Sequence, residues 1–340
     1  MPSLLNDARI DTVHLNFEQT VPRAWVHKRS LDNVLLTEIR AAEENRFICA
    51  GRLPTAHCFF NDTGRTPHKD ILFYTELGRQ ASLAVCHAFL DVSTEDVFIF
   101  EGSDAAITEA AWTPAGGLPR DSVAIEIRIR DLTRRKNNAV SRVVTEHTMW
   151  VGGQHVFHGT GAFTIQPAAL FQRLRRTSAA PNPATSAGGR QDGWTGARAT
   201  HVPRASGGNI AISAPQRGDA PGEFAASLIV DHTHPYFFDH PCDHVPGMLL
   251  LEGCAQLALT AFGETTGVEA AGISAYDVSF RQFVESGVET KLTAHADATR
   301  NIDGLASAPV VCLLISQQNT VCGTTTIHLA LPTGHVTGER

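Results

Sequence analysis

The chain has 340 residues, 43% of them hydrophobic, which is enough for one large core or two of ordinary size. Its formal net charge of -7 at pH 7 excludes a protein that holds nucleic acid through a general basic field. No basic segment followed by an apolar stretch opens the sequence, and the apolar run at 248–262 is interrupted by Glu252 and Gln256, so we expect neither a leader peptide nor a membrane span.

The first half predicts an extended segment, one apolar helix and then several strands. The helix is expected at 71–90, where the sequence is apolar and free of proline. The strands that follow it are expected at 97–100, 123–131, 140–151 and 155–165.

The middle of the chain is rich in alanine, glycine, proline, serine and threonine, and it has few large apolar side chains. This composition is typical of connecting chain, and we expect a linker at 167–200. The positive charges at 173–176 are interpreted as part of a solvated linker, with docking of an acidic partner as the alternative.

The second half follows the same order of elements. Its helix is expected at 247–263, after Pro246, in a segment rich in leucine, methionine, glutamate and alanine. Because this helix is apolar nearly all round, other elements must cover most of its sides. The expected strands that cover it lie at 274–283, 290–297, 309–316 and 320–331.

Three blocks of residues recur in the two halves, in the same order and at nearly the same offset, which indicates an internal duplication. The blocks are Val26, Lys28, Ser30, Asn33, Val34, Leu36 and Thr37, matched by Val202, Arg204, Ser206, Asn209, Ile210, Ile212 and Ser213; His57, Phe59 and Phe60, matched by His234, Tyr236 and Phe237; and Glu76 and Gln80, matched by Glu252 and Gln256. We therefore expect repeats at 1–166 and 201–340. One long buried helix in a curled antiparallel sheet, twice over, is an α+β tandem (double) hot-dog fold.

The stretch from Phe238 to Glu252, with Asp, His, Pro and Gly at fixed spacings before an apolar helix, closely resembles the signature of the A-factor synthase family. The first half is similar to that family's first repeat through Val26, His27, Leu36, Thr37, Glu76, Arg79 and Gln80. The resemblance implies that a β-ketoacyl group is moved from acyl carrier protein to the hydroxyl of dihydroxyacetone phosphate. It covers most of the chain outside the linker.

The sequence departs from the family pattern at two places. Ala255 stands where the second repeat of the family usually has arginine, whereas the first repeat keeps Arg79. Lys69, Asp70 and Ile71 stand where the family tends to have His, Asp and Pro. A more distant similarity, through Pro246, Gly247, Glu252, Gln256, Phe280, Arg281 and Val284, is to β-hydroxyacyl-carrier-protein dehydratases, which are hot-dog enzymes that act on acyl thioesters.

Acyl transfer needs a base for the attacking hydroxyl and donors for the developing oxyanion. Glu252 with Gln256, and Glu76 with Gln80, each share one helix face. We expect both glutamates to have a raised pKa that suits a general base, because a carboxylate in so apolar a helix is costly to bury without a partner. Glu252→Gln should then lower turnover more than binding. The alternative is a structural carboxylate that is hydrogen-bonded to its own sheet.

Four histidines and one aspartate are further candidates. His240 and His244 are proposed as catalytic, with a capping or turn role as the alternative, and Asp243 beside them as substrate-binding. His57 and His234 are candidates for substrate binding, although a structural role is favoured for both. No matching set of ligand spacings is visible among these residues, so no metal is expected.

Three further positions complete the predicted site. The free N–H groups at the start of the second helix, near Gly247, are expected to face a thioester carbonyl. Arg79 either binds a phosphate or neutralises Glu76, and Gln80 and Gln256 are assigned to substrate binding. The basic positions 128, 130 and 134–136 are interpreted as a solvated strand edge, with carrier-protein docking as the alternative.

The sequence thus favours an acyltransferase of γ-butyrolactone-type biosynthesis, with a site wherever a helix glutamate of one half meets loop residues of the other. A hot-dog dehydratase or thioesterase, and a non-catalytic sensor of acyl ligands, are the alternatives. The seven cysteines lack paired short spacings, which favours the cytoplasm. No nucleotide-binding loop is visible, so no cofactor is expected. Pairing into a homodimer is left open.

Overall fold

The computed structural model describes residues 15–62, 70–112, 122–177, 202, 204–297 and 308–331. Strands from both halves form one antiparallel twelve-stranded sheet, in the order β1-β2-β4-β5-β6-β3-β9-β12-β11-β10-β8-β7. The first half contributes β1 (Leu36–Glu43), β2 (Arg46–Arg52), β3 (Val97–Ile107), β4 (Ser122–Arg134), β5 (Val140–Val151) and β6 (Gln154–Gln166). The second half contributes β7 (Gln216–Arg217), β8 (Glu223–Ser227), β9 (Gly272–Phe280), β10 (Lys291–Asp297), β11 (Val310–Gln317) and β12 (Thr320–Ala330).

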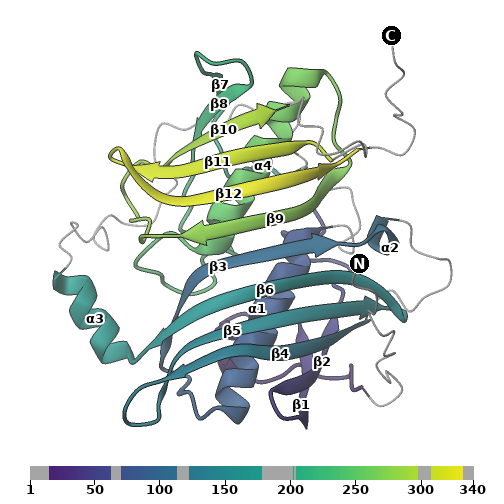
Figure 1. Cartoon of the computed structure of the whole chain (residues 1–340), viewed down its shortest axis with the longest axis vertical. Helices are drawn as coiled ribbons and strands as arrows, with labels where there is room; N and C mark the ends of the chain where they lie inside the picture. Colours follow the sequence, from purple (N-terminus) through teal and green to yellow (C-terminus); the bar gives the residue numbers. More distant parts are fainter. Residues whose placement is uncertain are drawn as a thin grey trace, which may run out of the picture.

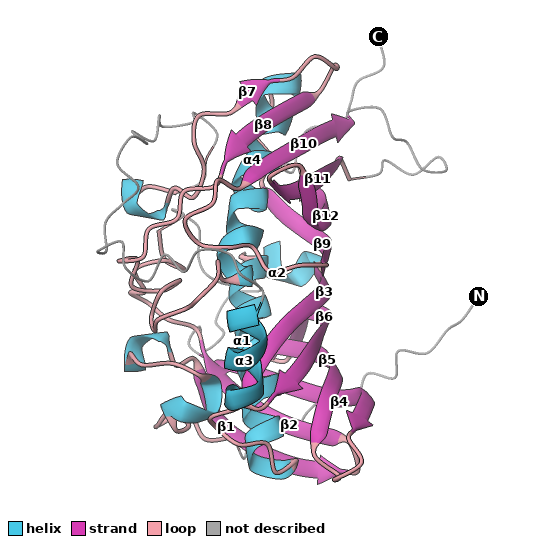
Figure 2. Ribbon diagram, turned by 90° about the vertical axis from the view of Figure 1, so that its left-hand side faces the viewer, coloured by secondary structure: helices cyan, strands magenta, loops and turns pink. Residues whose placement is uncertain are grey.

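One long helix in each half lies on the same face of this sheet (Figure 2). Helix α1 spans Ile71–Phe89, and Asp70 caps its start by accepting a hydrogen bond from the N–H of Leu72. Helix α4 spans Gly247–Thr266 and ends at Gly267, whose φ of 70° suits glycine. Two short helices, α2 (Glu109–Trp112) and α3 (Ala168–Thr177), complete the set, together with 3-10 turns at Arg23–Val26, Leu31–Asn33 and Gly207–Asn209.

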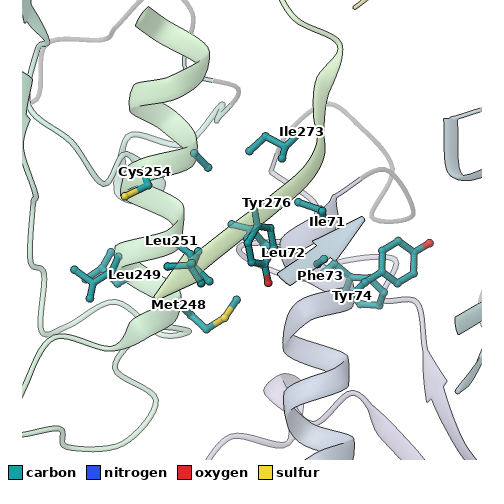
Figure 3. Close-up of a cluster of buried hydrophobic side chains, with 14 of the residues drawn as sticks. Ile71, Leu72, Phe73, Tyr74, Met248, Leu249, Leu251, Cys254, Ile273 and Tyr276 are labelled. Carbon is teal, nitrogen blue, oxygen red and sulfur yellow. The ribbon is translucent and has the colours of Figure 1, made fainter. Parts of the chain in front are cut away.

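Each half is therefore an antiparallel sheet around one long buried helix, and the expected double hot-dog fold is confirmed (Figure 1). The halves join where β3 pairs with β9, from Gly102 opposite Ser279 to Ala106 opposite Ala275. The N-terminal turns of α1 and α4 also meet, and their apolar side chains share one buried cluster with Tyr276 of β9 (Figure 3).

The expected strands are found, but their lengths differ. Strand β3 was expected only at 97–100 and continues to Ile107 through Gly102, Ser103, Ala105 and Ala106. These small residues have little intrinsic preference for a strand, and pairing with β6 on one side and β9 on the other compensates for it. Strand β9 ends at Phe280, three residues before the expected end, because the chain leaves the sheet there.

Two further differences concern the ends of each repeat. The segments expected only as extended contain the paired strands β1 and β2 in the first half and β7 and β8 in the second. The charges at 173–176, expected in a solvated linker, belong to α3, where Arg175 binds Asp243 and Glu285. None of the described helices is long and apolar enough to cross a membrane.

Candidate active site at the junction of the two halves

The two halves exchange loop contacts that hold the site together. The carboxylate of Asp239, from the second half, accepts hydrogen bonds from the backbone N–H of Ser30 and the side-chain amide of Asn33. In the same way, Asp62 of the first half accepts from Ser206 N–H and the Asn209 amide. Each repeat therefore positions the turn that precedes the first long strand of the other.

His57 and His234 support these turns and do not face substrate. In each, the Nδ1 atom accepts two backbone N–H groups, and Nε2 therefore donates to the amide oxygen of Asn33 or Asn209, at 3.0 and 2.8 Å. Burial lowers the pKa of His57 to about 4 and also lowers the pKa of His234. The substrate-binding assignment is corrected to a structural one, because both ring nitrogens are used.

Gln80 and Gln256 are likewise occupied by the chain. Their amide oxygens accept the N–H groups of Leu35 and Ala211, at 2.9 and 2.8 Å. Their amide nitrogens donate to a backbone carbonyl and to the glutamate one turn earlier. Gln80 and Gln256 therefore orient Glu76 and Glu252, and this role replaces the substrate binding that we expected of them.

Glu76 is fully buried between two cations, a group that we call the Glu76 cluster. Arg79 binds both of its oxygens, at 2.8 and 2.9 Å, and the ammonium of Lys28 lies 3.1 Å away. Burial alone would raise the pKa of Glu76, but Arg79 and Lys28 hold it well below its ordinary value. The expectation of a raised pKa is wrong for Glu76, because Arg79 and Lys28 bind its carboxylate. A general-base role for Glu76 remains a prediction, which these partners disfavour.

Glu252 is also paired, in what we call the Glu252 cluster. Arg204 binds its two oxygens at 2.7 and 2.8 Å, donates to the carbonyl of Phe59 and stacks 3.9 Å above the Phe59 ring. The carboxylate of Asp70 lies 3.5 Å from the same guanidinium. The expectation that Glu252 lacks a partner is wrong, because the repeat equivalent of Lys28 is an arginine that binds both of its oxygens. The catalytic assignment of Glu252 remains a prediction.

A cavity of about 520 Å³ opens beside the Glu76 cluster, and we call it the first cavity. It lies between α1, the 236–248 loop, the start of β3 and helix α3. Its polar end is formed by His27, Lys28, Glu76, Arg79, Tyr236 and His240. Its apolar walls include Leu83, Phe98, Phe100, Phe163, Phe171 and Met248. The cavity therefore has a cationic end and largely aromatic and aliphatic walls.

Two polar atoms that line this cavity are shielded from solvent and have no hydrogen-bond partner among the described residues. They are the hydroxyl of Tyr236 and Nδ1 of His240. Burial, and then the neighbouring Glu76, raises the pKa of Tyr236, so its hydroxyl stays a donor. Burial, together with Lys28 and Arg79, lowers the pKa of His240, so its ring is neutral at neutral pH. A bound substrate would supply the partners that both atoms lack.

A histidine pair lies at the same end. Nδ1 of His87 contacts the carbonyl of Val92 at 2.9 Å and must be its protonated nitrogen, so Nε2 of His87 accepts from Nε2 of His27 at 3.0 Å. Burial, and then His87, lowers the pKa of His27 to about 3. His27 therefore presents a neutral ring to the cavity.

His244, Asp243 and Gly247 form the wall opposite α1. Asp243 accepts from His244 Nδ1 at 2.6 Å and from Arg175 at 2.9 Å. These two partners outweigh burial and lower the pKa of Asp243 to about 2. Since Asp243 is bound by Arg175, it orients His244 and ties α3 to the cavity. No side chain among the described residues caps the start of α4, and its first residues, Gly247 and Met248, line the cavity.

Sequence reasoning missed Lys28, His27, Tyr236 and Phe100 as lining residues of the site. Lys28 and Tyr236 belong to the recurring blocks, and the equivalent residues of the other repeat are Arg204 and Phe59. This difference between equivalent positions could have indicated that Lys28 and Tyr236 belong to the site. Among the described residues, no group of three or more His, Cys, Asp or Glu side chains is arranged to hold a metal ion.

The sequence matches the model of the A-factor biosynthesis hotdog domain at residues 10–154 and 193–331. It is 32% identical, over 70% of this chain and 76% of the relative, to a 2-oxo-3-(phosphooxy)propyl 3-oxoalkanoate synthase of Streptomyces virginiae. A protein of the same description from Streptomyces coelicolor is 26% identical over 76% of this chain and 78% of its own length.

Among solved structures, a putative oleoyl thioesterase from Lactobacillus plantarum superposes with a TM-score of 0.50 at 14% identity, over 84% of this chain and 97% of its own. At that identity the likeness concerns the fold alone. The family model covers both repeats, and the chain belongs to the A-factor biosynthesis hotdog family.

Proposed function

We propose that this protein is an acyltransferase that joins a β-ketoacyl group, carried as a thioester, to the hydroxyl of a phosphorylated three-carbon hydroxy-ketone such as dihydroxyacetone phosphate. The product is the 2-oxo-3-(phosphooxy)propyl 3-oxoalkanoate named for the Streptomyces relatives. The observation that carries the proposal is the first cavity, with two cations at one end and aromatic and aliphatic walls along the rest.

The cationic end suits the phosphate of the acceptor. Lys28 and Arg79 present an ammonium and a guanidinium at this end, beside the carboxylate of Glu76 and with that of Asp239 acting on Lys28 from the neighbouring loop. A phosphate would supply several acceptor oxygens for these charged donors. Arg79 thus both neutralises Glu76 and contributes to the phosphate site.

The unpartnered atoms suit the chemistry at the carbonyl. The acceptor hydroxyl attacks the thioester carbon and forms the new C–O bond, while its proton passes to Nδ1 of His240. The Tyr236 hydroxyl and the N–H groups at Gly247 donate to the oxyanion. When the C–S bond breaks, the thiolate takes the proton back from His240, so the ring ends as it began.

The phosphate also adjusts the base. Lys28 and Arg79 lower the pKa of His240 in the free protein. A bound dianion offsets these two charges, and the pKa of His240 rises toward neutral pH when the acceptor is in place. A general base is most effective when its pKa lies near the working pH. Binding of the phosphorylated substrate would therefore make His240 a better general base.

The natural donor is proposed to be a β-ketoacyl group on acyl carrier protein, in the cytoplasm. The apolar walls support a long acyl chain, and α3 carries Arg173 and Arg176 beside the cavity wall formed by Phe171 and Gln172. A homodimer is compatible with the proposal but is not needed by it, since the first cavity is lined by both repeats of one chain.

The test is mass spectrometry of purified protein incubated with a β-ketoacyl pantetheine thioester, with and without dihydroxyacetone phosphate. We expect the phosphorylated ester only when the acceptor is present. Loss of the thioester without acceptor would indicate a thioesterase, loss of water from a β-hydroxyacyl thioester a dehydratase, and binding without turnover a sensor.

A variant pair assigns the proton acceptor. His240→Gln keeps the size of the side chain and should lower turnover about 100-fold or more, the usual effect of losing a general base. His232→Gln, an exposed histidine on the same loop, is the matched control and should leave turnover unchanged. Equal turnover in both variants would remove His240 from the mechanism.

A further inference from the structure

A second cavity, of about 330 Å³, adjoins the first. The two share Phe100, His244 and Gly247 as lining residues. Most of the other walls of the second cavity are apolar and come from Ile99, Val245, Leu250, Phe280, Phe283 and Val284. The second cavity is therefore next to the first cavity at the start of α4.

The second cavity lies where the strands that join the two halves, β3 and β9, are no longer paired. Strand β3 pairs with β9 only from Gly102 onward, and its first residues, Val97 to Phe100, pair with β6 alone. On the other side, β9 ends at Phe280, and the N–H groups of Arg281 and Gln282 donate to the carbonyl of Cys322 on β12, the strand on the far side of β9 from β3. The space between these two segments lies over the first turn of α4.

The side chain of Phe100 lines both cavities, together with His244 and Gly247, and we regard its ring as the partition between them. It packs against the rings of Phe163 and Phe280, with centroids 5.4 and 5.5 Å away. A Cβ atom at Gly247 would lie 2.9 Å from the ring, so glycine is what allows the ring to approach the helix. The partition is thus one half-buried side chain held by other rings.

The polar residues that line the second cavity are few, and two of them are paired within the protein. Glu101 binds Arg142 at 2.9 Å and accepts a hydrogen bond from Thr164, and His244 is held by Asp243. Arg281 and Gln282, which also line the cavity, are exposed to solvent. The apolar part of the cavity is suited to an aliphatic chain, whereas burying such a chain at the cationic end of the first cavity would remove water from charged groups at a cost in free energy.

We infer that the second cavity holds the distal part of the donor's acyl chain, and that Phe100 is its entrance and sets the preferred chain length. The inference rests on the proposed function for the identity of the donor. With the phosphate of the acceptor at Lys28 and Arg79 and the thioester carbonyl near Gly247, a short chain stays in the first cavity. A longer chain passes Phe100 and is buried behind it.

The experiment measures binding and needs no turnover. Dissociation constants are determined for hexanoyl- and dodecanoyl-pantetheine with the full chain and with Ile99→Trp, which fills the second cavity from a half-exposed position. Dodecanoyl binding should weaken at least tenfold, since each methylene left in water costs about fourfold in affinity, and hexanoyl binding should not change.

Val97→Trp is the matched control, because Val97 lies two residues earlier on the same strand and lines only the first cavity. It should not discriminate between the two chains in this way. Wild-type affinity for dodecanoyl-pantetheine in Ile99→Trp would overturn the inference, and so would equal weakening of both ligands. Thermal unfolding followed by circular dichroism confirms that each variant is folded.

Phe100→Ala tests the entrance. Removal of the ring joins the cavities, and affinity should rise about fourfold for each methylene newly buried in chains longer than dodecanoyl. Adding Ile99→Trp to this variant should abolish the gain. An unchanged chain-length profile in Phe100→Ala would rule out Phe100 as the selector. A protein that binds by chain length but forms no ester would support the second cavity and refute the proposed function.

Discussion

The two repeats keep the same scaffold around their glutamates but differ in the charges next to them. Glu76 lies between Lys28 and Arg79, whereas Arg204 is the one cation bound to Glu252 among the described residues, with Ala255 in the place of the second arginine. Lys28 lies over the ring of Tyr236, whereas Arg204 lies over the ring of Phe59, its repeat counterpart without a hydroxyl. The first cluster therefore has a second cation and a tyrosine hydroxyl that has no hydrogen-bond partner among the described residues, and the second cluster has neither.

This difference suggests that the two repeats have different roles, one in stabilising the fold and the other in activity. A carboxylate bound at both oxygens by one arginine forms a closed pair, and such a pair ties the loop at Phe59 to α4. In the first repeat, by contrast, Lys28, Glu76 and Arg79 all line the first cavity. We therefore expect changes in the Glu252 cluster to affect folding and changes in the Glu76 cluster to affect activity.

The largest expected effect is on stability, in the Glu252 cluster. Arg204→Met leaves the Glu252 carboxylate buried without a cation, bound only by the amide of Gln256, and should lower the free energy of unfolding by about 3–5 kcal/mol. Urea denaturation measures this loss. Glu252→Gln should also destabilise the fold while the folded fraction keeps its turnover, in contrast to the catalytic role that the sequence suggested. A large loss of turnover in well-folded Glu252→Gln would return this residue to the mechanism.

The next largest effect is expected on turnover, from a substitution that makes the surroundings of Glu76 resemble those of Glu252. Tyr236→Phe removes the unpartnered hydroxyl from the cavity and should lower kcat about 100-fold, the usual effect of losing one oxyanion donor. Steady-state kinetics with saturating acceptor measures it. Phe59→Tyr, the reciprocal change, should lower stability and leave kcat of the folded protein unchanged. If both variants behave alike, the two rings are equivalent and the distinction fails.

A smaller effect is expected on acceptor recognition. Lys28→Met should raise KM for dihydroxyacetone phosphate roughly 10- to 100-fold, because one charge-assisted contact of about 1.5–3 kcal/mol is lost. Unphosphorylated dihydroxyacetone is the control substrate, and its already poor use should change little. An equal loss for both acceptors would place Lys28 in support of Glu76 and not in contact with the phosphate.

The smallest expected effect is a shift between two pH profiles. The pKa of His240 lies below its ordinary 6.5 in the free protein, so kcat/KM should stay high as the pH falls through that value and decrease only below it. In the complex the phosphate offsets Lys28 and Arg79, so the decrease of kcat should occur at a higher pH. Coincident acid limbs would show that the acceptor does not act on His240.

Much of this architecture was predictable. The recurrence of Lys28 as Arg204 and of Glu76 as Glu252 predicted the duplication, and the helix at 71–90 was placed to within one residue at its end. The start of α4 at Gly247 was also predicted, and its role in facing a thioester carbonyl remains a prediction. The boundaries 1–166, 167–200 and 201–340 remain a prediction, and so do the catalytic assignments of His240 and His244. Lys69, where the chain departs from the family, lies outside the described residues.

The sequence by itself determined the repeat, the two apolar helices, the antiparallel strands and the positions of the glutamates, because these follow from local periodicity and from internal similarity. Only the tertiary structure decided which glutamate faces a cavity and which cations bind each of them. The pKa of Glu76, for example, depends on burial and on charges brought together from distant segments, such as that of Lys28. Local sequence does not encode these distances, and the packing of one repeat on the other sets them.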